Sequence, residues 1–468
     1  MKKVVLNIIG VLLVFGCGES PQEQQFSSGC SEGGGSYSEG SYTPTDEDSS
    51  GGGSNTASWT GTKQLGTTGD DYVSGITSDS SGNIYLTGFT EGPIDGNTSA
   101  GGYDVFVTKY DNTGVKKWTR LVGSEVYDHP ANIVSDLSNN LYIVGRTSGN
   151  FDGNTNNEGS DVFLVKYNSI GEKQWSRQLG STKIFQVPND YGTGVTVDQS
   201  GFVYITGYTY GVFHDKPNQV RSPECFFAKY SSEGALIWVK HCLQYPSSTG
   251  DGNDIIIDGT GNLYVYVNRG NNLILLKHDS DGVLKWSRQL GTTSQEQGSR
   301  IATDTSGNIF LTGFTQGSLG NSQAGGRLRG DIFTTKYDSS GNILWVKQLG
   351  SFEDESGGDI STDSQGNIYV VGDTEGGLAG NYNANGNRGI KDIFVVKYQN
   401  DGTLEWIRQI GTFEIDSSTN ITIDQFDNAY VVLQSNGDFD GKTNLGLNDV
   451  FIIKYDSNAG VVAGHRSN

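Results

Sequence analysis

The chain has few basic residues, few histidines and none of the common catalytic motifs. Its 468 residues hold 32 Lys and Arg against 53 Asp and Glu, a formal net charge of −21 at pH 7. A surface of that sign repels phosphates, which argues against a nucleic-acid partner. The five His residues share no spacing, and no zinc pattern, Gly-x-Ser-x-Gly turn or phosphate loop is present. We therefore expect no catalytic residue and no cofactor apart from a possible Ca²⁺ ion.

Methionine and proline are also scarce, with one and eight residues, whereas glycine is abundant at 68 residues. High glycine together with many Tyr, Phe, Thr and Val predicts short strands and turns rather than helices. The length is sufficient to bury a large hydrophobic core. An all-β fold is therefore expected.

The N-terminus has no apolar run long enough to span a bilayer comfortably. Lys2 and Lys3 precede an apolar run over 4–15, which fits a secretory signal. The run ends Val-Phe-Gly-Cys at Cys17 and resembles a bacterial lipoprotein signal. The resemblance implies removal of residues 1–16, diacylation of Cys17, and an anchor in the bacterial cell envelope. Gly18 after the cysteine favours the outer membrane. The alternative is an ordinary signal peptide with an accidental cysteine.

Residues 17–56 are rich in Ser, Gly and Glu and contain no Lys or Arg. Such a segment cannot bury enough apolar surface to fold, so it is expected to be a disordered acidic tether. A flexible chain of this length has an r.m.s. span of about 35 Å. The tether would let a folded head stand off a membrane.

Residues 57–468 consist of one unit repeated seven times. A lysine and an aspartate mark the unit: Lys109, Lys166, Lys229, Lys277, Lys336, Lys397 and Lys454; Asp79, Asp136, Asp198, Asp258, Asp304, Asp363 and Asp424. Each unit holds four short strands bounded by Gly, Asn and Asp turns. This pattern predicts a seven-bladed β-propeller of four-stranded blades. An open solenoid is the alternative, but it needs capping repeats and none is visible.

The two ends of the repeat region predict how the ring closes. The last unit stops after its third strand, near Tyr455, and lacks the Trp and the Gln-Leu-Gly ending of the others. The missing strand stands at the other end, at 60–66. We expect this N-terminal strand to pair with 449–455 and complete blade seven.

Seven segments of the GN(I/L/V)Y type, each followed by a DVFxxKY-like strand, resemble the SBBP-type β-propeller repeat family. The resemblance covers about 57–455, with blade four departing from it at Asn272 and His278. It implies a bacterial envelope or secreted propeller without a general catalytic activity.

A second set of acids lies near the start of each unit, on the loops that approach the central channel. If these carboxylates face the channel, they form a ring that attracts cations such as Ca²⁺. The alternative is that each acid caps its own loop. The set is Asp71, Asp128, Asp190, Asp251, Glu296, Glu355 and Asp416.

Cys225 and Cys242 lie opposite each other in a predicted hairpin. Counting outward from the turn at Glu233-Gly234 places them in a non-hydrogen-bonded pair, with Cα atoms about 4.5 Å apart. An exported protein meets oxidising conditions, so we expect a disulfide. The alternative is two reduced thiols packed as small apolar side chains.

Long loops on one face favour binding over catalysis. We expect a monomeric, envelope-anchored scaffold that presents this face to a protein or glycan partner. A polysaccharide hydrolase or lyase and a Ca²⁺-dependent adhesin are the alternatives.

Overall fold

The computed structural model describes residues 59–183, 187–213, 223–243, 250–319, 330–378 and 391–456. The expected signal peptide, Cys17 and the tether lie outside these residues. Thr56–Asn468 forms a unit of its own and is described by itself.

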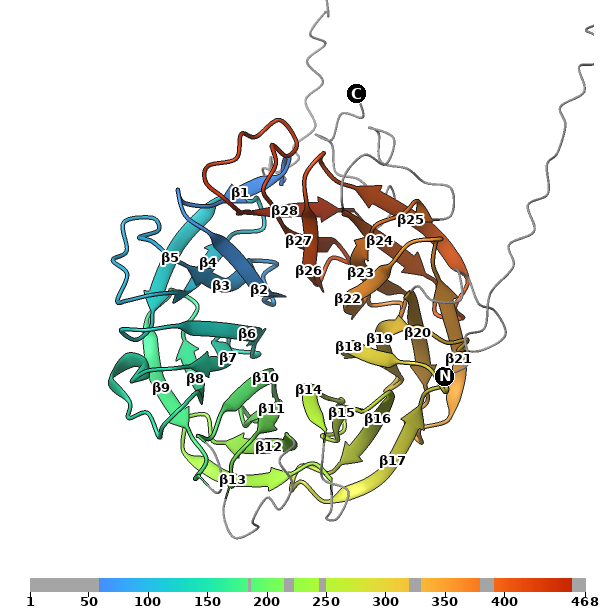
Figure 1. The fold of residues 1–468 in the computed structure, drawn as a ribbon, viewed down its shortest axis with the longest axis horizontal. Helices are drawn as coiled ribbons and strands as arrows, with labels where there is room; N and C mark the ends of the chain where they lie inside the picture. Colours follow the sequence, from blue (N-terminus) through green and yellow to red (C-terminus); the bar gives the residue numbers. More distant parts are fainter. Residues whose placement is uncertain are drawn as a thin grey trace, which may run out of the picture. The chain divides into compact units, whose positions relative to one another are not determined.

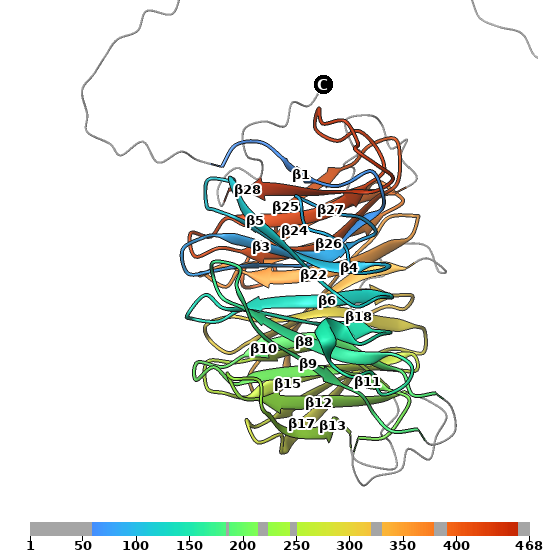
Figure 2. The same ribbon diagram turned by 90° about the vertical axis from the view of Figure 1, so that its left-hand side faces the viewer.

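This unit contains seven four-stranded sheets arranged around a central axis (Figure 1). Neighbouring strands within each sheet are antiparallel. The prediction of a seven-bladed β-propeller is confirmed. Figure 2 views the ring from its side. Blades 1 to 6 are β2–β5, β6–β9, β10–β13, β14–β17, β18–β21 and β22–β25, and blade 7 is β26–β28 with β1.

The inner strands line the axis, and the second strands pair with them. The inner strands are β2 (Asp71–Ser78), β6 (Asp128–Ser135), β10 (Asp190–Val197), β14 (Asp251–Ile257), β18 (Glu296–Thr303), β22 (Glu355–Thr362) and β26 (Asp416–Ile423). The second strands are β3 (Ile84–Thr90), β7 (Leu141–Thr147), β11 (Val203–Thr209), β15 (Leu263–Arg269), β19 (Ile309–Thr315), β23 (Ile368–Thr374) and β27 (Ala429–Ser435).

The third and outer strands complete each blade. The third strands are β4 (Asp104–Tyr110), β8 (Asp161–Tyr167), β12 (Glu224–Tyr230), β16 (Asn272–His278), β20 (Asp331–Tyr337), β24 (Asp392–Tyr398) and β28 (Asp449–Tyr455). The outer strands are β5 (Lys116–Val122), β9 (Lys173–Leu179), β13 (Leu236–His241), β17 (Leu284–Leu290), β21 (Ile343–Leu349), β25 (Leu404–Ile410) and β1 (Lys63–Leu65).

The core consists of seven hydrophobic clusters, one at each junction between neighbouring blades. The second and third strands are buried on both faces, whereas the outer strands begin with exposed residues. This explains why the middle strands are apolar at successive positions rather than alternating. Burial of apolar surface between blades, at about 25 cal/mol per Å², is the main stabilising term.

The N-terminal strand closes the ring as predicted. β1 pairs with β28 in antiparallel register, with Lys63 opposite Ile452 and Leu65 opposite Val450. Figure 1 shows β1 at the outer edge of blade 7, beside the start of blade 1. The pairing gives β28 a partner along its otherwise open edge.

The two faces of the ring differ in their connections. Tight turns join the inner to the second strand and the third to the outer strand, and we call this side the turn face. In the first of these turns Asp79 accepts the backbone N–H groups of Ser81 at 2.8 Å and Asn83 at 3.0 Å. The loops from second to third strand, such as 91–103, and those between blades form the opposite side, the loop face.

Helix is nearly absent from the described residues. One short 3₁₀ turn, η1 (Phe151–Gly153), interrupts a loop of blade 2. Within the residues described, no helix has the length and apolar character needed to cross a membrane.

Candidate functional site

Six of the seven acids predicted to form a cation ring are buried in their own loops. Asp71 accepts hydrogen bonds from the Thr67 backbone N–H at 2.5 Å and hydroxyl at 2.9 Å. Asp128 and Glu296 bind Ser124 and Thr292 in the same way. Contacts of this kind recur at Asp190, Glu355 and Asp416. The carboxylates are therefore not gathered around the channel, and each one shapes the loop between two blades.

The seventh acid, Asp251, is not equivalent to the other six. The Gly250 N–H donates to the Pro223 carbonyl at 2.9 Å, as the Asp71 N–H donates to the Asn448 carbonyl at 3.1 Å. Gly250 therefore occupies the ring position in blade 4. Asp251 lies one residue further, at the position that Tyr72 holds in blade 1. Gly250 precedes Asp258 by eight residues, as Asp71 precedes Asp79, so the spacing is unchanged and the ring position of blade 4 holds a glycine instead of an acid.

Five of the six buried acids lie beside an acid of the preceding blade, whereas Glu296 lies beside Asn272. Burial raises the pKa of Asp190 to about 6, and the neighbouring Asp161 carboxylate adds to the rise. Burial also raises the pKa of Asp416 to about 6, with Asp392 contributing. Among the described residues, no group of three or more His, Cys, Asp or Glu is placed to hold a metal ion.

Cys225 and Cys242 form a disulfide between β12 and the end of β13, with Cα atoms 5.4 Å apart. The Cys242 N–H donates to the Cys225 carbonyl at 3.0 Å. The pair is thus a hydrogen-bonded one, not the non-hydrogen-bonded pair expected from the sequence. The reason is a register shift between Lys229 and Tyr230, which adds one residue beside the turn and reverses the alternation. The disulfide lies in the cluster between blades 3 and 4.

A chain of ring contacts runs across the loop face of blades 1 to 3. We call it the aromatic crescent and define it as Tyr72, Phe89, Tyr103, Tyr127, His129, Arg146, Tyr191, Tyr208 and Tyr210. Each member is partly exposed, and Tyr127 is 55% exposed. The crescent combines flat apolar rings with polar atoms at their edges.

The blade 1 half of the crescent is centred on Phe89. Its ring stacks on Tyr72 with centroids 4.8 Å apart. It meets Tyr103 and His129 edge-to-face at 5.2 and 4.6 Å. Tyr127 lies 5.6 Å from Tyr103. Mutual packing of this kind holds the rings in fixed orientations.

The crescent continues through Arg146, which is paired with His129 across β6 and β7. The Arg146 guanidinium lies 4.9 Å from the ring centroid of Tyr191. Tyr191 stacks on Tyr208 with centroids 4.6 Å apart, and Tyr210 lies 6.2 Å beyond. Burial raises the pKa of Tyr208 to about 12, and Tyr191 and then Asp251 add to the rise.

The other blades do not continue this surface. The first two positions of the crescent, Tyr72 and Phe89, face each other across β2 and β3. The same cross-strand positions in blades 4 to 7 hold Asp251 and Asn268, Gln297 and Phe314, Ser356 and Asp373, and Ser417 and Gln434. The seven blades are therefore not equivalent on the loop face. In the sequence, this difference between the blades is visible in the residue that follows each acid at the start of an inner strand. The residues shared by all seven repeats do not reveal it.

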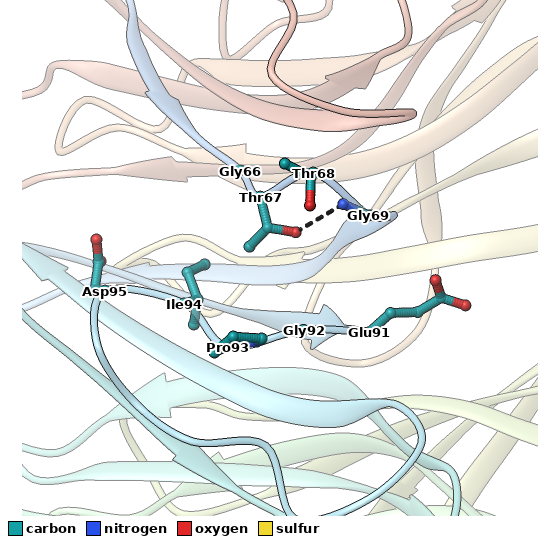
Figure 3. A pocket seen from close by; sticks show the side chains of 9 residues that line it. All are labelled: Gly66, Thr67, Thr68, Gly69, Glu91, Gly92, Pro93, Ile94 and Asp95. Atoms are coloured by element: carbon teal, nitrogen blue, oxygen red, sulfur yellow. Dashed lines mark hydrogen bonds between the residues drawn. The ribbon is translucent and has the colours of Figure 1, made fainter.

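A polar groove adjoins the crescent at the seam between blades 7 and 1 (Figure 3). It has a volume of about 510 Å³ and is lined by 66–69 and 91–95. Three glycines leave backbone groups accessible in it, and Thr67, Thr68, Glu91 and Asp95 add side-chain oxygens. Glu91 also joins the groove to the crescent, because its carboxylate accepts a hydrogen bond that raises the pKa of Tyr103 to about 12.

The fold and this surface define a seven-bladed β-propeller with an aromatic crescent on one side of its loop face. The family model of the SBBP β-propeller repeat matches six segments of the chain: 61–95, 117–152, 174–214, 285–321, 344–379 and 405–440. The chain belongs to this repeat family, as the sequence resemblance predicted. The stretch from β12 to β16, with the disulfide and Asp251, falls between the matches.

Two curated relatives share low identity with the chain. An uncharacterized WD repeat-containing protein of Acanthamoeba polyphaga mimivirus is 23% identical over 440 residues, covering 72% of this chain and 31% of the relative. The regulatory protein FlaEY of Caulobacter vibrioides is 26% identical over 161 residues, covering 32% of this chain and 17% of the relative. The chain thus spans less than a third of the length of either relative.

Three solved structures with a similar trace are distant in sequence. Raptor of Chaetomium thermophilum has a TM-score of 0.48 at 9% identity, covering 86% of this chain and 29% of that one. Virginiamycin B lyase of Staphylococcus aureus has a TM-score of 0.46 at 10% identity, with coverages of 84% and 98%. A periplasmic gluconolactonase of Pseudomonas aeruginosa has a TM-score of 0.45 at 12% identity, with coverages of 72% and 85%.

Proposed function

We propose that this propeller is a non-catalytic scaffold that binds an uncharged glycan along the aromatic crescent and the adjoining groove. The observation that carries the proposal is the confinement of the aromatic surface to blades 1 to 3. Sugar rings present C–H faces that pack on aromatic rings, and their hydroxyl groups exchange hydrogen bonds with side chains at the ring edges. Arg146, His129 and Glu91 supply such polar edges.

Charge restricts the class of glycan. The net charge of −21 disfavours polyanionic polysaccharides, because their approach is repelled at long range. The groove beside the crescent combines backbone groups, hydroxyls and two carboxylates with the apolar side chains of Pro93 and Ile94. That lining suits hydroxyl groups better than the apolar anchor of a protein partner.

The titration of the tyrosines argues against one of them acting as the general base of a polysaccharide-cleaving enzyme. A tyrosine that acts as a general base needs a lowered pKa. The pKa of Tyr103 is raised to about 12 by its hydrogen bond to Glu91 and by burial. Burial, with Tyr191 and Asp251 adding to it, raises the pKa of Tyr208 to about 12. Both side chains stay protonated at neutral pH.

Glycan-array binding followed by calorimetry tests the proposal. The test variant is Tyr72→Ala/Tyr127→Ala/Tyr191→Ala, which removes three rings from the crescent. With about 1 kcal/mol lost per ring, binding should weaken on the order of 100-fold. The matched control is Phe352→Ala/Phe413→Ala, because these rings are 85% and 59% exposed on loops of blades 6 and 7. Equal weakening by both variants, or binding to no uncharged glycan, would rule out the crescent as the site.

We also propose that Cys17 carries a lipid that anchors the propeller in the bacterial outer membrane through the 17–56 tether. The support is the sequence of the first 17 residues, with Lys2 and Lys3 before an apolar run that ends at the cysteine. Cys17→Ser should move the protein from the membrane fraction to the soluble fraction and abolish labelling by a fatty-acid analogue. Continued labelling of the variant would contradict the assignment.

A further inference from the structure

The inner strands carry a second polar cluster, deeper in the channel than the crescent. The position after the bulge of each inner strand is occupied by Gly75, Asn132, Gly194, Asp254, Arg300, Asp359 and Asn420. Five of these seven residues are polar or charged, and the charged ones stand in three successive blades. The cluster is therefore another place where the sevenfold repeat is broken.

The two carboxylates of this cluster are already hydrogen bonded to backbone. Asp254 accepts the N–H of Ile255 at 3.0 Å and that of Ile301 in the next blade at 3.3 Å. Asp359 accepts the N–H of Ile360 at 2.7 Å and that of Ile421 in the next blade at 2.9 Å. These bonds satisfy N–H groups along the free edges of the inner strands.

Arg300 is not satisfied in this way. Its Nη2 donates to the Ala131 carbonyl in blade 2 at 3.2 Å, so the side chain reaches across the channel. Among the described residues, this is the one hydrogen bond that the Arg300 side chain makes, although its guanidinium has five N–H donors. Asp254 and Asp359 lie near enough to raise the pKa of Arg300 against the opposing effect of burial. The Arg300 side chain is partly exposed, so its remaining N–H donors are accessible from the channel.

A cavity of about 250 Å³ adjoins these residues. Its lining includes Asp254, Arg300 and Asp359, together with the apolar side chains of Val134, Ile256 and Ala302. The lining residues lie farther along the inner strands than Tyr72, His129 and Tyr191, toward the turn face. A volume of this size corresponds to about eight water molecules, which suits a single small ring and not a chain.

We propose that this cavity binds one small, uncharged, polyhydroxylated molecule of monosaccharide size. Asp254 and Asp359 would repel an anion, and Arg300 would repel a cation. A neutral molecule is repelled by none of the three. Each hydroxyl group of such a molecule can accept a hydrogen bond from the Arg300 guanidinium and donate one to the carboxylate of Asp254 or Asp359. The apolar walls then contact the C–H groups of the ring, as in most small-molecule sites.

The site is separate from the crescent, and its test uses free monosaccharides rather than glycan chains. The probes are a panel of neutral hexoses and polyols, including glucose, with glucosamine and glucuronate as cationic and anionic analogues of the same ring. Saturation-transfer NMR and calorimetry should detect at least one neutral probe at concentrations up to about 10 mM. Its charged analogue should bind at least about tenfold more weakly.

Two variants locate the site. Arg300→Gln removes most of the N–H donors, and Ala302→Leu fills the cavity without changing a polar group. Each should weaken binding of the neutral probe by about tenfold or more, while the crescent variant Tyr72→Ala/Tyr127→Ala/Tyr191→Ala leaves it unchanged. If Arg300→Gln fails to fold, Ala302→Leu and hydrogen exchange of wild-type residues 254–256 and 300–302 decide the question. The exchange of these residues should slow when the probe is added.

The proposal is overturned if no neutral probe binds, if a charged analogue binds more tightly, or if Ala302→Leu leaves binding unchanged. Loss of probe binding in the crescent variant would also overturn it, because the site would then lie on the loop face. A failure of glycan binding at the crescent leaves this test intact, because the two sites share no residue.

Discussion

The indole of Trp59 packs beneath Gly114, the glycine of the turn between β4 and β5 in blade 1. Gly114 has a φ of +78°, and a Cβ atom on it would lie 2.9 Å from Cδ2 of Trp59. Trp118 and Gly171 repeat the relationship at the next junction, as do Trp175 and Gly234. Trp59 stands outside β1 and two residues away from the repeat register, yet it takes the place of the outer-strand Trp of blade 7. The ring is therefore closed by the indole as well as by strand pairing.

Trp59→Ala should destabilise the whole ring. The indole is 2% exposed and belongs to the cluster between blades 7 and 1. Truncation of a buried aromatic side chain costs about 3–5 kcal/mol. Chemical denaturation should show this loss as a lower midpoint, whereas Phe352→Ala, at an 85% exposed ring, should leave the midpoint unchanged. Equal midpoints for wild type and Trp59→Ala would mean that strand pairing alone closes the ring.

The glycine that follows six of the seven outer strands leaves room for a buried carboxylate. A Cβ on Gly123 would lie 2.0 Å from Oδ1 of Asp104 and 2.9 Å from Oδ2 of Asp128. Gly123→Ala should therefore lower the melting temperature strongly, since buried backbone and carboxylates would have to move. Gly259→Ala is the control, because nothing lies within 4 Å of its Cβ position. Similar melting temperatures for the two variants would contradict this packing.

The protein should be more stable at pH 5 than at pH 8. Burial raises the pKa of Asp190, Asp254 and Asp416 to about 6, from an ordinary value of 3.8. The folded state therefore binds protons more tightly than the unfolded state between these values. Stability is lost as the pH rises through about 6 and is regained as it falls toward 4, by on the order of 2 kcal/mol per group.

Thermal unfolding across this pH range checks the direction, and one pair of variants checks the cause. Asp190→Asn should reduce the pH dependence. Glu125→Gln removes the same charge from an exposed loop position and should leave the dependence unchanged. A melting temperature that rises from pH 5 to pH 8 would be the opposite of what buried carboxylates require.

The disulfide should contribute little to stability. It links Cys225 and Cys242, which are 17 residues apart, and a loop of about this length is worth about 3 kcal/mol in the chain-entropy model. The hairpin already holds the two strands together, so the measured loss should be smaller. Cys225→Val/Cys242→Val places in blade 3 the pair that blade 1 has at Val105 and Val122. Its melting temperature should lie close to that of the oxidised wild type. Mass spectrometry of non-reduced peptides should find the two cysteines linked, and free thiols in protein purified from its native cells would refute the bond.

The register of the repeats could be predicted from the sequence, but the partners of the repeated bases could not. Lys109 lies opposite Trp118 in the β4–β5 pair. Its ammonium nevertheless lies over Tyr85, 5.0 Å from the ring centroid, and donates to the Ser169 carbonyl of the next blade. The Arg120 guanidinium covers the indole instead, 5.3 Å from its centroid, and its Nε binds the Gly171 carbonyl rather than an acid. Contacts with the next blade fix where the side chains of Lys109 and Arg120 lie. The sequence of a single blade does not reveal these contacts.

The sequence by itself determined the number of blades, the four-stranded pattern, the family and the strand that closes the ring. These features follow from local signals, because each blade is specified by its own turn residues and apolar strands. The same signals recur at a regular spacing along the chain. Only the tertiary structure decided which side chains meet between blades. It buried the carboxylates of Asp71 and Asp128 in their own loops, and it joined Tyr72, His129 and Tyr191 into one surface. It also brought Arg300 across the channel toward Ala131. The crescent residues lie about one repeat apart along the chain and Arg300 lies about three repeats from Ala131, so the arrangement of the blades in the ring brings them into contact.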